Sequence, residues 1–132
     1  MTRYLLDTNT ISDFIRHPQG SVAGRIPRLG SGAVCTSIIV AAELRFGVEK
    51  RGSRKLATRV AEALDMLEVL PFEPPADAVY GVIRAKLEKA GGPIAANDLL
   101  NAAHAISLGY TLVTDNARDF SRIGGLSAEN WR

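Results

Sequence analysis

The sequence predicts an α/β fold in which helices cover a short central parallel sheet on both sides, a three-layer α/β/α sandwich. Four short apolar segments with the composition of buried strands alternate along the chain with longer segments of helical periodicity. A run of capping residues, glycines or prolines separates most of these segments. At 132 residues the chain has the length of one domain, and we expect residues 1–132 to form it.

In the first half of the chain, Tyr4, Leu5 and Leu6 form an apolar run suited to a strand that is buried on both faces. The next segment is predicted to be a helix that ends before Pro18, because the residue before a proline is pushed out of the helical region. A short helix over 19–30, a strand over 33–36 and a helix from Thr36 or Ser37 to about Lys50 complete this half.

In the second half, a helix over 54–67 leads to a third short strand over 68–70. Periodicity then predicts helices over 76–90 and 97–108, a fourth strand over 111–114 and a short helix over 116–120. In the helix over 76–90, we expect an inward face made of Val79, Val82, Ile83 and Leu87.

Composition indicates a soluble protein of the cytoplasm. Hydrophobic residues make up 46% of the chain and charged residues 23%, with a mean hydropathy of +0.04. No apolar run approaches the length that crosses a membrane, and the N-terminal residues lack the sections of a signal peptide. Cys35 is the only cysteine, which excludes an intrachain disulfide and fits a small core residue in a reducing compartment.

The charge balance permits nucleic-acid binding without establishing it. Sixteen Lys and Arg against fourteen Asp and Glu give a net charge of +2 and a pI of about 8.9. The basic residues concentrate in the middle of the chain, at Arg45, Lys50, Arg51, Arg54, Lys55 and Arg59. Such a cluster is either an ordinary solvated helix face or a surface that contacts phosphates.

Acidic and amide side chains follow the first and the fourth predicted strands directly. Asp7 comes after Leu6, and Asp115 and Asn116 come after the strand that ends at Thr114. Ligands of parallel sheets bind at the carboxyl ends of the strands, so these positions suit chemistry. The plainer interpretation is that Asp7 only caps the helix that follows.

Two further acids lie on predicted helices. Glu43 shares a helix face with Ile39 and Phe46, and we expect it to point inward. Asp98 is predicted to be the second residue of its helix, where an interaction with the helix dipole would also explain it. Carboxylates that converge without a cation repel one another, whereas a hard divalent ion bound through oxygen would hold them ionised.

Other site chemistries fit the sequence poorly. Cys35, His17 and His104 are too few and too scattered for a zinc or copper site. His104 stands among alanines and is expected to be structural, and neither a Walker loop nor a Ser-His-Asp pattern is present. Magnesium or manganese held by carboxylates remains, and its commonest use is phosphate chemistry.

Five spaced blocks resemble the signature blocks of PIN-domain ribonuclease toxins, and more narrowly those of the VapC toxins of bacterial toxin–antitoxin pairs. The blocks cover nearly the whole chain in the family's order: Leu5 to Asn9, Thr36 to Ile38 with Glu43 to Gly47, Pro93-Ile94 with Asp98, Ala102 to Ala105, and Leu112 to Asn116 through Phe120. A Gly-Leu…Trp ending, here Gly125-Leu126…Trp131, is similar to that of many VapC chains.

This resemblance implies an endoribonuclease that uses Mg²⁺, with Mn²⁺ able to substitute, and that hydrolyses RNA with a metal-activated water. It also implies a homodimer, an antitoxin that inhibits the site, and promoter DNA bound only through that antitoxin. By matched position, the catalytic residues are Asp7, Glu43, Asp98 and Asn116, with Asp7 and Asp98 as the metal ligands. The substrate-binding positions are Thr8, Asn9 and Thr114, to which we add Arg45 from the basic cluster.

Two other functions stay open at this point. A phosphatase similar to the haloacid dehalogenases also begins with a strand and an acid, but it needs a second acid where this chain has Asn9. A non-catalytic α/β interaction module would use the acids only as caps or as a partner surface. Also open are whether Asp115, Asn116 or Asp119 supports the metal, and what Asn101 does.

Overall fold

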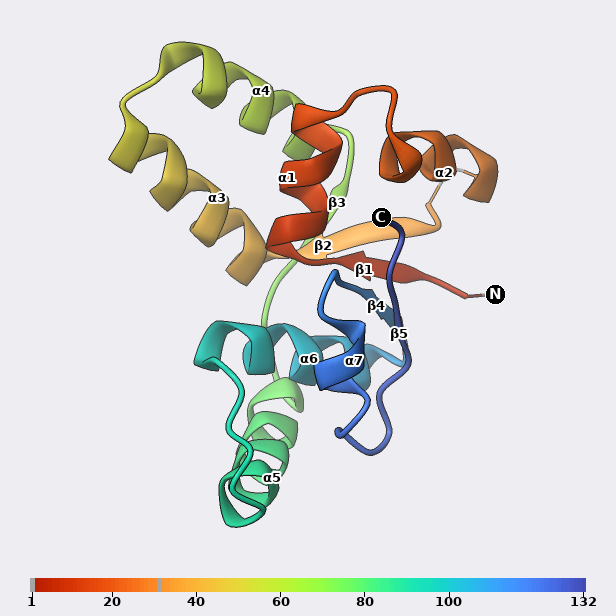
Figure 1. Ribbon diagram of the computed structural model, residues 1–132, viewed down its shortest axis with the longest axis vertical. Coiled ribbons are helices and arrows are strands. Elements are labelled where there is room, and N and C mark those ends of the chain that lie inside the picture. The colour runs from red at the N-terminus through yellow and green to blue at the C-terminus, as the bar shows by residue number, and fades with distance from the viewer. Residues whose placement is uncertain (1, 31) are drawn as a thin grey trace.

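The computed structural model describes residues 2–30 and 32–132 and has three layers (Figure 1). A sheet crosses the middle of the molecule, with helices α1 to α4 on one face and α5 to α7 on the other. The strands are β1 (Tyr4–Leu6), β2 (Val34–Ser37), β3 (Glu68–Leu70), β4 (Thr111–Val113) and β5 (Ala128–Glu129). Their order is β3-β2-β1-β4-β5, and each neighbouring pair is parallel. The predicted α/β/α sandwich with a parallel sheet is confirmed.

The helices begin and end close to where the capping residues predict. They are α1 (Thr8–Arg16), α2 (Ser21–Leu29), α3 (Ile38–Arg51), α4 (Arg54–Asp65), α5 (Ala76–Lys89), α6 (Ala96–Leu108) and α7 (Ala117–Phe120). The hydroxyls of Ser37 and Ser53 accept backbone N–H bonds at the starts of α3 and α4. Gly52 and Gly109 end α3 and α6 in the left-handed conformation, which glycine adopts without strain.

Neighbouring strand residues point into two different cores. Leu6 and Val113 pack with the residues of α1 to α4, whereas Leu5, Cys35 and Leu112 pack with those of α5 to α7. All five side chains are fully buried. This burial on both faces explains why the strand sequences read as continuous apolar runs rather than as alternating ones. The placement of Cys35 in the core is confirmed.

The register of the sheet fixes where the site lies. Leu6 at the end of β1 is aligned with Thr36 of β2 on one side and with Val113 of β4 on the other. The residues that follow these strands therefore emerge at the same edge of the sheet. Asp7 and Thr114 are among them, as the carboxyl ends of parallel strands predict.

The sequence prediction missed β5, which consists of only two residues. It is too short to carry a hydrophobic pattern, and it exists because its backbone continues the sheet beyond β4. The Leu112 N–H donates to Ser127 O and the Thr114 N–H donates to Glu129 O, both at 2.9 Å. Backbone pairing, which has no sequence signature, therefore defines the edge strand.

Two residues that were expected to be buried are largely exposed. Val82 on α5 is 55% exposed and Phe46 on α3 is 67% exposed. In α3 the buried residues are Val40, Ala41 and Leu44, so the inward face lies one position away from the predicted one. Both helices contain enough apolar residues to fill more than one face, and periodicity alone selected the wrong members.

No helix in the described ranges combines the length and the apolarity needed to cross a membrane.

Candidate active site

Asp7 leaves β1 and caps α1 at the same time. Its Oδ1 accepts a hydrogen bond of 2.9 Å from the Thr10 backbone N–H, and its own N–H donates to Val113 O at 3.0 Å. The side chain is only 6% exposed. The capping interpretation is thus right about the hydrogen bond, but a cap uses one oxygen, and the Asp7 side chain also lines a polar pocket.

The segment after β4 supplies the opposite wall of this pocket. Thr114 is buried, and its Oγ1 accepts a hydrogen bond from the Asn116 N–H at 3.1 Å. One residue earlier, Val113 O accepts hydrogen bonds from the Asp7 N–H at 3.0 Å and from the Thr10 hydroxyl at 3.1 Å. These bonds hold the turn after β4 against the start of α1. Asp115 and Asn116 are half-buried in that turn.

The polar pocket has a volume of about 230 Å³. Six polar residues from three separate parts of the chain line it: Asp7, Asn9, Asp98, Thr114, Asp115 and Asn116. The sequence had singled out all six, and the sheet register together with α6 brings them to one place. We call this the acidic pocket. Asp119, which the sequence left as an alternative, is exposed and is not among the described residues that line it.

Asp98 reaches the acidic pocket from the first turn of α6. Because α6 begins at Ala96, Asp98 is the third helical residue rather than the second. It is half-buried and lies in the part of the helix where the dipole favours a negative charge. The same placement serves the dipole and the pocket, so the two interpretations do not compete.

Glu43 stands beside the acidic pocket rather than in its lining. It is half-buried on α3, and the Thr8 hydroxyl donates a 2.8 Å hydrogen bond to its Oε1. Thr8 and Glu43 together line an adjoining groove of about 260 Å³ between α1, α3 and α4. The expected face shared with Phe46 was wrong, but the carboxylate is turned toward α1 and the other acids.

The pKa values of Asp7 and Asp98 reflect their burial and the closeness of the other acids. Burial raises the pKa of Asp7, and hydrogen bonds from Thr114 and Thr10 counteract part of that rise. Burial also raises the pKa of Asp98, and the negative charges of Asp7, Glu43 and Asp115 raise it further. Proximity of a divalent cation would lower both pKa values by favouring the charged carboxylates.

The donor set of the acidic pocket suits Mg²⁺ or Mn²⁺. In residues 2–30 and 32–132, no group of three or more His, Cys, Asp or Glu side chains is arranged to hold a metal. Mg²⁺, however, is usually held by one or two carboxylates and keeps several of its waters. Three buried or half-buried acids line the pocket with amide and hydroxyl oxygens around them, which is enough for the one or two carboxylates that Mg²⁺ takes. Zinc sites are usually built on nitrogen or sulfur ligands.

Arg45 does not contribute to the acidic pocket in the described part of the chain. It is exposed on α3 and faces a shallow depression beside Val48 and Glu49. All six residues of the basic cluster are exposed, three on α3 and three on α4. The cluster is therefore a solvated surface that an extended ligand could reach, and its role in substrate binding stays a prediction.

His104 is structural, as predicted. It is 2% exposed, its Nδ1 is 2.8 Å from the Ser37 hydroxyl, and its ring packs edge-on against Phe72. Burial lowers its pKa, so the neutral form is favoured. Asn101, one turn earlier on α6, is also buried, and within the described residues its Oδ1 has no hydrogen-bond partner. Neither residue lines the acidic pocket.

Sequence reasoning missed one cation beside the site. Arg132 forms ion pairs with Asp115 and with Asp13 of α1. Residues 13, 115 and 132 are far apart in the sequence and share no motif, so no pattern could have connected them.

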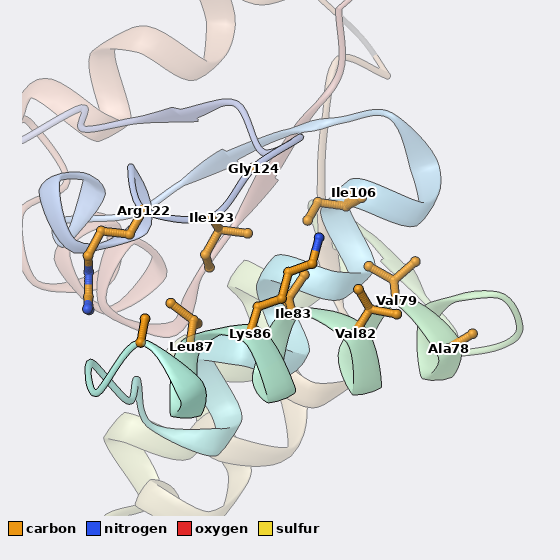
Figure 2. A pocket seen from close by; sticks show the side chains of 11 residues that line it. Ala78, Val79, Val82, Ile83, Lys86, Leu87, Ile106, Arg122, Ile123 and Gly124 are labelled. Atoms are coloured by element: carbon orange, nitrogen blue, oxygen red, sulfur yellow. The ribbon is translucent and has the colours of Figure 1, made fainter.

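A larger apolar groove of about 950 Å³ lies on the other side of the sheet, along α5 (Figure 2). Val79, Val82, Ile83 and Leu87 point into it from α5, and Ile106 and Ile123 close it from above in the view of Figure 2. None of the described residues that line it carries a carboxylate, in contrast to the lining of the acidic pocket.

The PIN domain family model matches residues 4–126. Ribonuclease VapC2 of Haemophilus influenzae is 38% identical over 99% of both chains. The chain belongs to the VapC ribonucleases of the PIN-domain family. It is also 36% identical, over 99% of both chains, to the tRNA(fMet)-specific endonuclease VapC of Shigella flexneri. The crystal structure of VapBC2 from Rickettsia felis bound to a promoter DNA fragment superposes with a TM-score of 0.91, at 36% identity over 99% of this chain and 100% of that one.

Membership of the VapC family confirms the resemblance drawn from the five sequence blocks. The chain is thus a ribonuclease toxin of a toxin–antitoxin system. The acidic pocket occupies the edge of the sheet where its family motifs converge, and the pocket residues come from those same blocks.

Proposed function

We propose that this VapC-family chain is a Mg²⁺- or Mn²⁺-dependent endoribonuclease whose active site is the acidic pocket. The observation that carries the proposal is the convergence of Asp7 and Asp98, with raised pKa values, among neutral oxygen donors at the carboxyl edge of the sheet. Buried acids are costly unless a cation or a proton compensates them. A divalent cation at this position could assist the hydrolysis of an RNA phosphodiester.

Asp7 and Asp98 would hold the ion, with oxygens of Asn116 and Thr114 beside it. When bound, the metal supplies activation of a water and neutralisation of charge on the phosphodiester. Glu43, whose carboxylate accepts a hydrogen bond from the Thr8 hydroxyl, would orient the attacking water or a second ion. Asn9, exposed at the rim, contacts the RNA next to the cleaved bond.

The basic cluster extends this site into a surface for the RNA backbone. Arg45, Lys50, Arg51, Arg54, Lys55 and Arg59 are exposed along α3 and α4. Several lysines and arginines on one hairpin attract phosphates without reading sequence. We therefore propose that the cluster aids binding, while the specificity for one RNA arises from the shape of unpaired loops near the acidic pocket. Such cleavage would take place in the cytoplasm.

A cognate antitoxin is proposed to inhibit this site and to connect the toxin with promoter DNA. The proposal is supported by the Rickettsia felis VapBC2 structure, which was solved bound to a promoter DNA fragment. An antitoxin arginine would pair with the acidic pocket, because a guanidinium binds carboxylates through two parallel hydrogen bonds. The adjoining groove beside Glu43 could hold the segment that carries this arginine.

We also propose a homodimer. Ile38 and Phe46, both on α3, are 47% and 67% exposed. Two large apolar side chains in water are unfavourable, and association with a second copy would bury them.

The test is cleavage of total bacterial RNA by the purified, antitoxin-free chain. With Mn²⁺ we expect discrete fragments that are absent when EDTA is present. Fragments that persist in EDTA would contradict metal dependence. Intact RNA under all conditions, from a protein that circular dichroism shows to be folded, would favour a non-catalytic interaction module.

A further inference from the structure

The Arg132 guanidinium lies between two carboxylates from different parts of the fold. Its Nε is 3.3 Å from Asp13 Oδ1, and its Nη1 is 3.1 Å from Asp115 Oδ2. Asp13 belongs to α1, whereas Asp115 follows β4 and lines the acidic pocket. The Arg132 side chain therefore connects a residue in the middle of α1 with a residue that lines the acidic pocket.

Asp13 anchors Arg132. It is 6% exposed, and a buried carboxylate is stable only when a charge or hydrogen bonds compensate it. Among the described residues, the His17 ring also lies near it, but its Nε2 is 3.9 Å from Asp13 Oδ1, close to the distance limit of an ion pair. The chain leading to Arg132 is fixed as well, because Trp131 is 3% exposed and packs against Tyr4. The guanidinium is thus held from two sides.

Asp115 has both of its carboxylate oxygens engaged by the protein. Oδ2 accepts from Arg132, and Oδ1 accepts from the Asn9 side-chain amide at 3.4 Å. Asp7 and Asp98 lack a cationic partner in the described residues, although they line the same pocket. The three acids of the pocket are therefore unequal: two are available to a cation, and the third is occupied.

We infer that Arg132 is a positioning residue which holds Asp115 away from the metal, so that Asp7 and Asp98 alone among the acids bind it. The inference rests on the proposed function. Without Arg132, Asp115 Oδ2 becomes free to turn into the pocket and to add a third carboxylate. A third carboxylate ligand would raise the affinity of the site for the metal and make the charge of the site more negative.

The experiment is calorimetric titration of Mn²⁺ into four proteins: the unchanged chain, Arg132→Ala, Asp115→Asn and the double variant. We expect Arg132→Ala to bind Mn²⁺ about tenfold more tightly, the scale on which outer partners of a metal site act. Asp115→Asn alone should change the affinity less than about threefold, because that carboxylate is already occupied by Arg132. In the Asp115→Asn background, Arg132→Ala should then have little effect.

The double variant separates this inference from a general effect of charge. If Arg132 acted only by repelling the cation, its removal would tighten Mn²⁺ binding equally in the chain with Asp115 and in the Asp115→Asn background, and the two substitutions would add. Arg25→Ala is the matched control, since Arg25 pairs with Glu129 and stacks on Trp131 without touching the pocket. It removes the same charge and should leave the affinity unchanged.

Each outcome decides the matter. Additive effects, or an unchanged affinity in Arg132→Ala, would overturn the positioning role while leaving the proposed metal site intact. A chain that binds no Mn²⁺ at all would overturn both. If Arg132→Ala unfolds because Asp13 loses its partner, Asp115→Asn still tests the inference: a loss of affinity of about tenfold or more in that variant would show that Asp115 already binds the metal.

Discussion

The Thr8 hydroxyl donates a hydrogen bond to the Glu43 carboxylate, with 2.8 Å between Oγ1 and Oε1. Thr8 directly follows Asp7, so this bond ties the position of an acid on α3 to the end of β1. It also explains how Glu43 can remain half-buried on a helix whose neighbouring residues are largely apolar.

Replacing Thr8 by Val removes this hydrogen bond and keeps the shape of the side chain. We expect RNA cleavage to fall by about 10- to 100-fold, because Glu43 loses the group that orients it. Thr8→Ser is the matched control and should retain most of the activity. Initial cleavage rates at fixed Mn²⁺ measure the effect, and equal losses in both variants would show that the hydroxyl does not matter.

Asp7→Asn should abolish cleavage and stabilise the metal-free protein. The asparagine oxygen can still accept the Thr10 N–H bond and cap α1, while the cost of burying a charge disappears. A gain of about 1 kcal/mol in the free energy of unfolding would raise the melting temperature by roughly 4 °C. A lower melting temperature would mean that the Asp7 charge is compensated in the metal-free protein.

The pH dependence of that stability difference has a definite sign. The pKa of Asp7 is raised above its ordinary value of 3.8, so the folded protein binds this proton more tightly than the unfolded chain does. The charged carboxylate therefore destabilises the fold at neutral pH, and the penalty is relieved as the pH falls through the raised pKa. The advantage of Asp7→Asn should thus be largest at about pH 7 and should shrink toward about pH 4. Urea unfolding at several pH values in EDTA measures it, and an advantage that grows on acidification would refute it.

Phe46→Asp should weaken self-association. A charge on the exposed face of α3 would have to be buried in the proposed dimer, so we expect the dissociation constant to rise at least about tenfold. Analytical ultracentrifugation measures the constant. Met66→Asp, at a residue that is 69% exposed just beyond α4, is the matched control and should leave the dimer unchanged. A monomeric unchanged chain would contradict the dimer itself.

Leu112→Ala should lower the free energy of unfolding by about 2 to 5 kcal/mol, the usual range for a buried leucine in a packed core. Leu112, on β4, is fully buried and packs with residues of the helices α5 to α7. Leu108, which is 40% exposed at the end of α6, provides a comparison because Leu108→Ala should cost much less. Urea denaturation of the two variants tests whether the α5 to α7 side forms a true core.

How far the sequence predicts this protein depends on the range of the interactions. Asp7, Asp98 and Asn116 could be placed in one site because each follows a strand or begins a helix, and the parallel sheet brings such positions together. The pairing of Arg132 with Asp13 and Asp115 could not, since it depends on the path of the chain after the last strand. The sequence did not predict the two residues of β5 for the same reason.

The inward faces of the helices form an intermediate case. Periodicity identified α3 and α5, but it could not choose among several apolar residues. Phe46 was assigned to the wrong side of α3, and Val82 lines an open groove instead of the core. Which residues are buried is decided by the neighbouring elements, and these are fixed only when the whole fold is known.

The most direct test of the central claim compares Asp98→Asn with Asp119→Asn. Both variants remove one negative charge from an acid that the sequence singled out, but only Asp98 lines the acidic pocket, while Asp119 is exposed outside it. Measured with Mn²⁺ on the same RNA, cleavage by Asp98→Asn should fall at least about 100-fold, and cleavage by Asp119→Asn should stay within about twofold of the unchanged chain. Equal activity of the two variants would contradict the assignment of the acidic pocket as the active site.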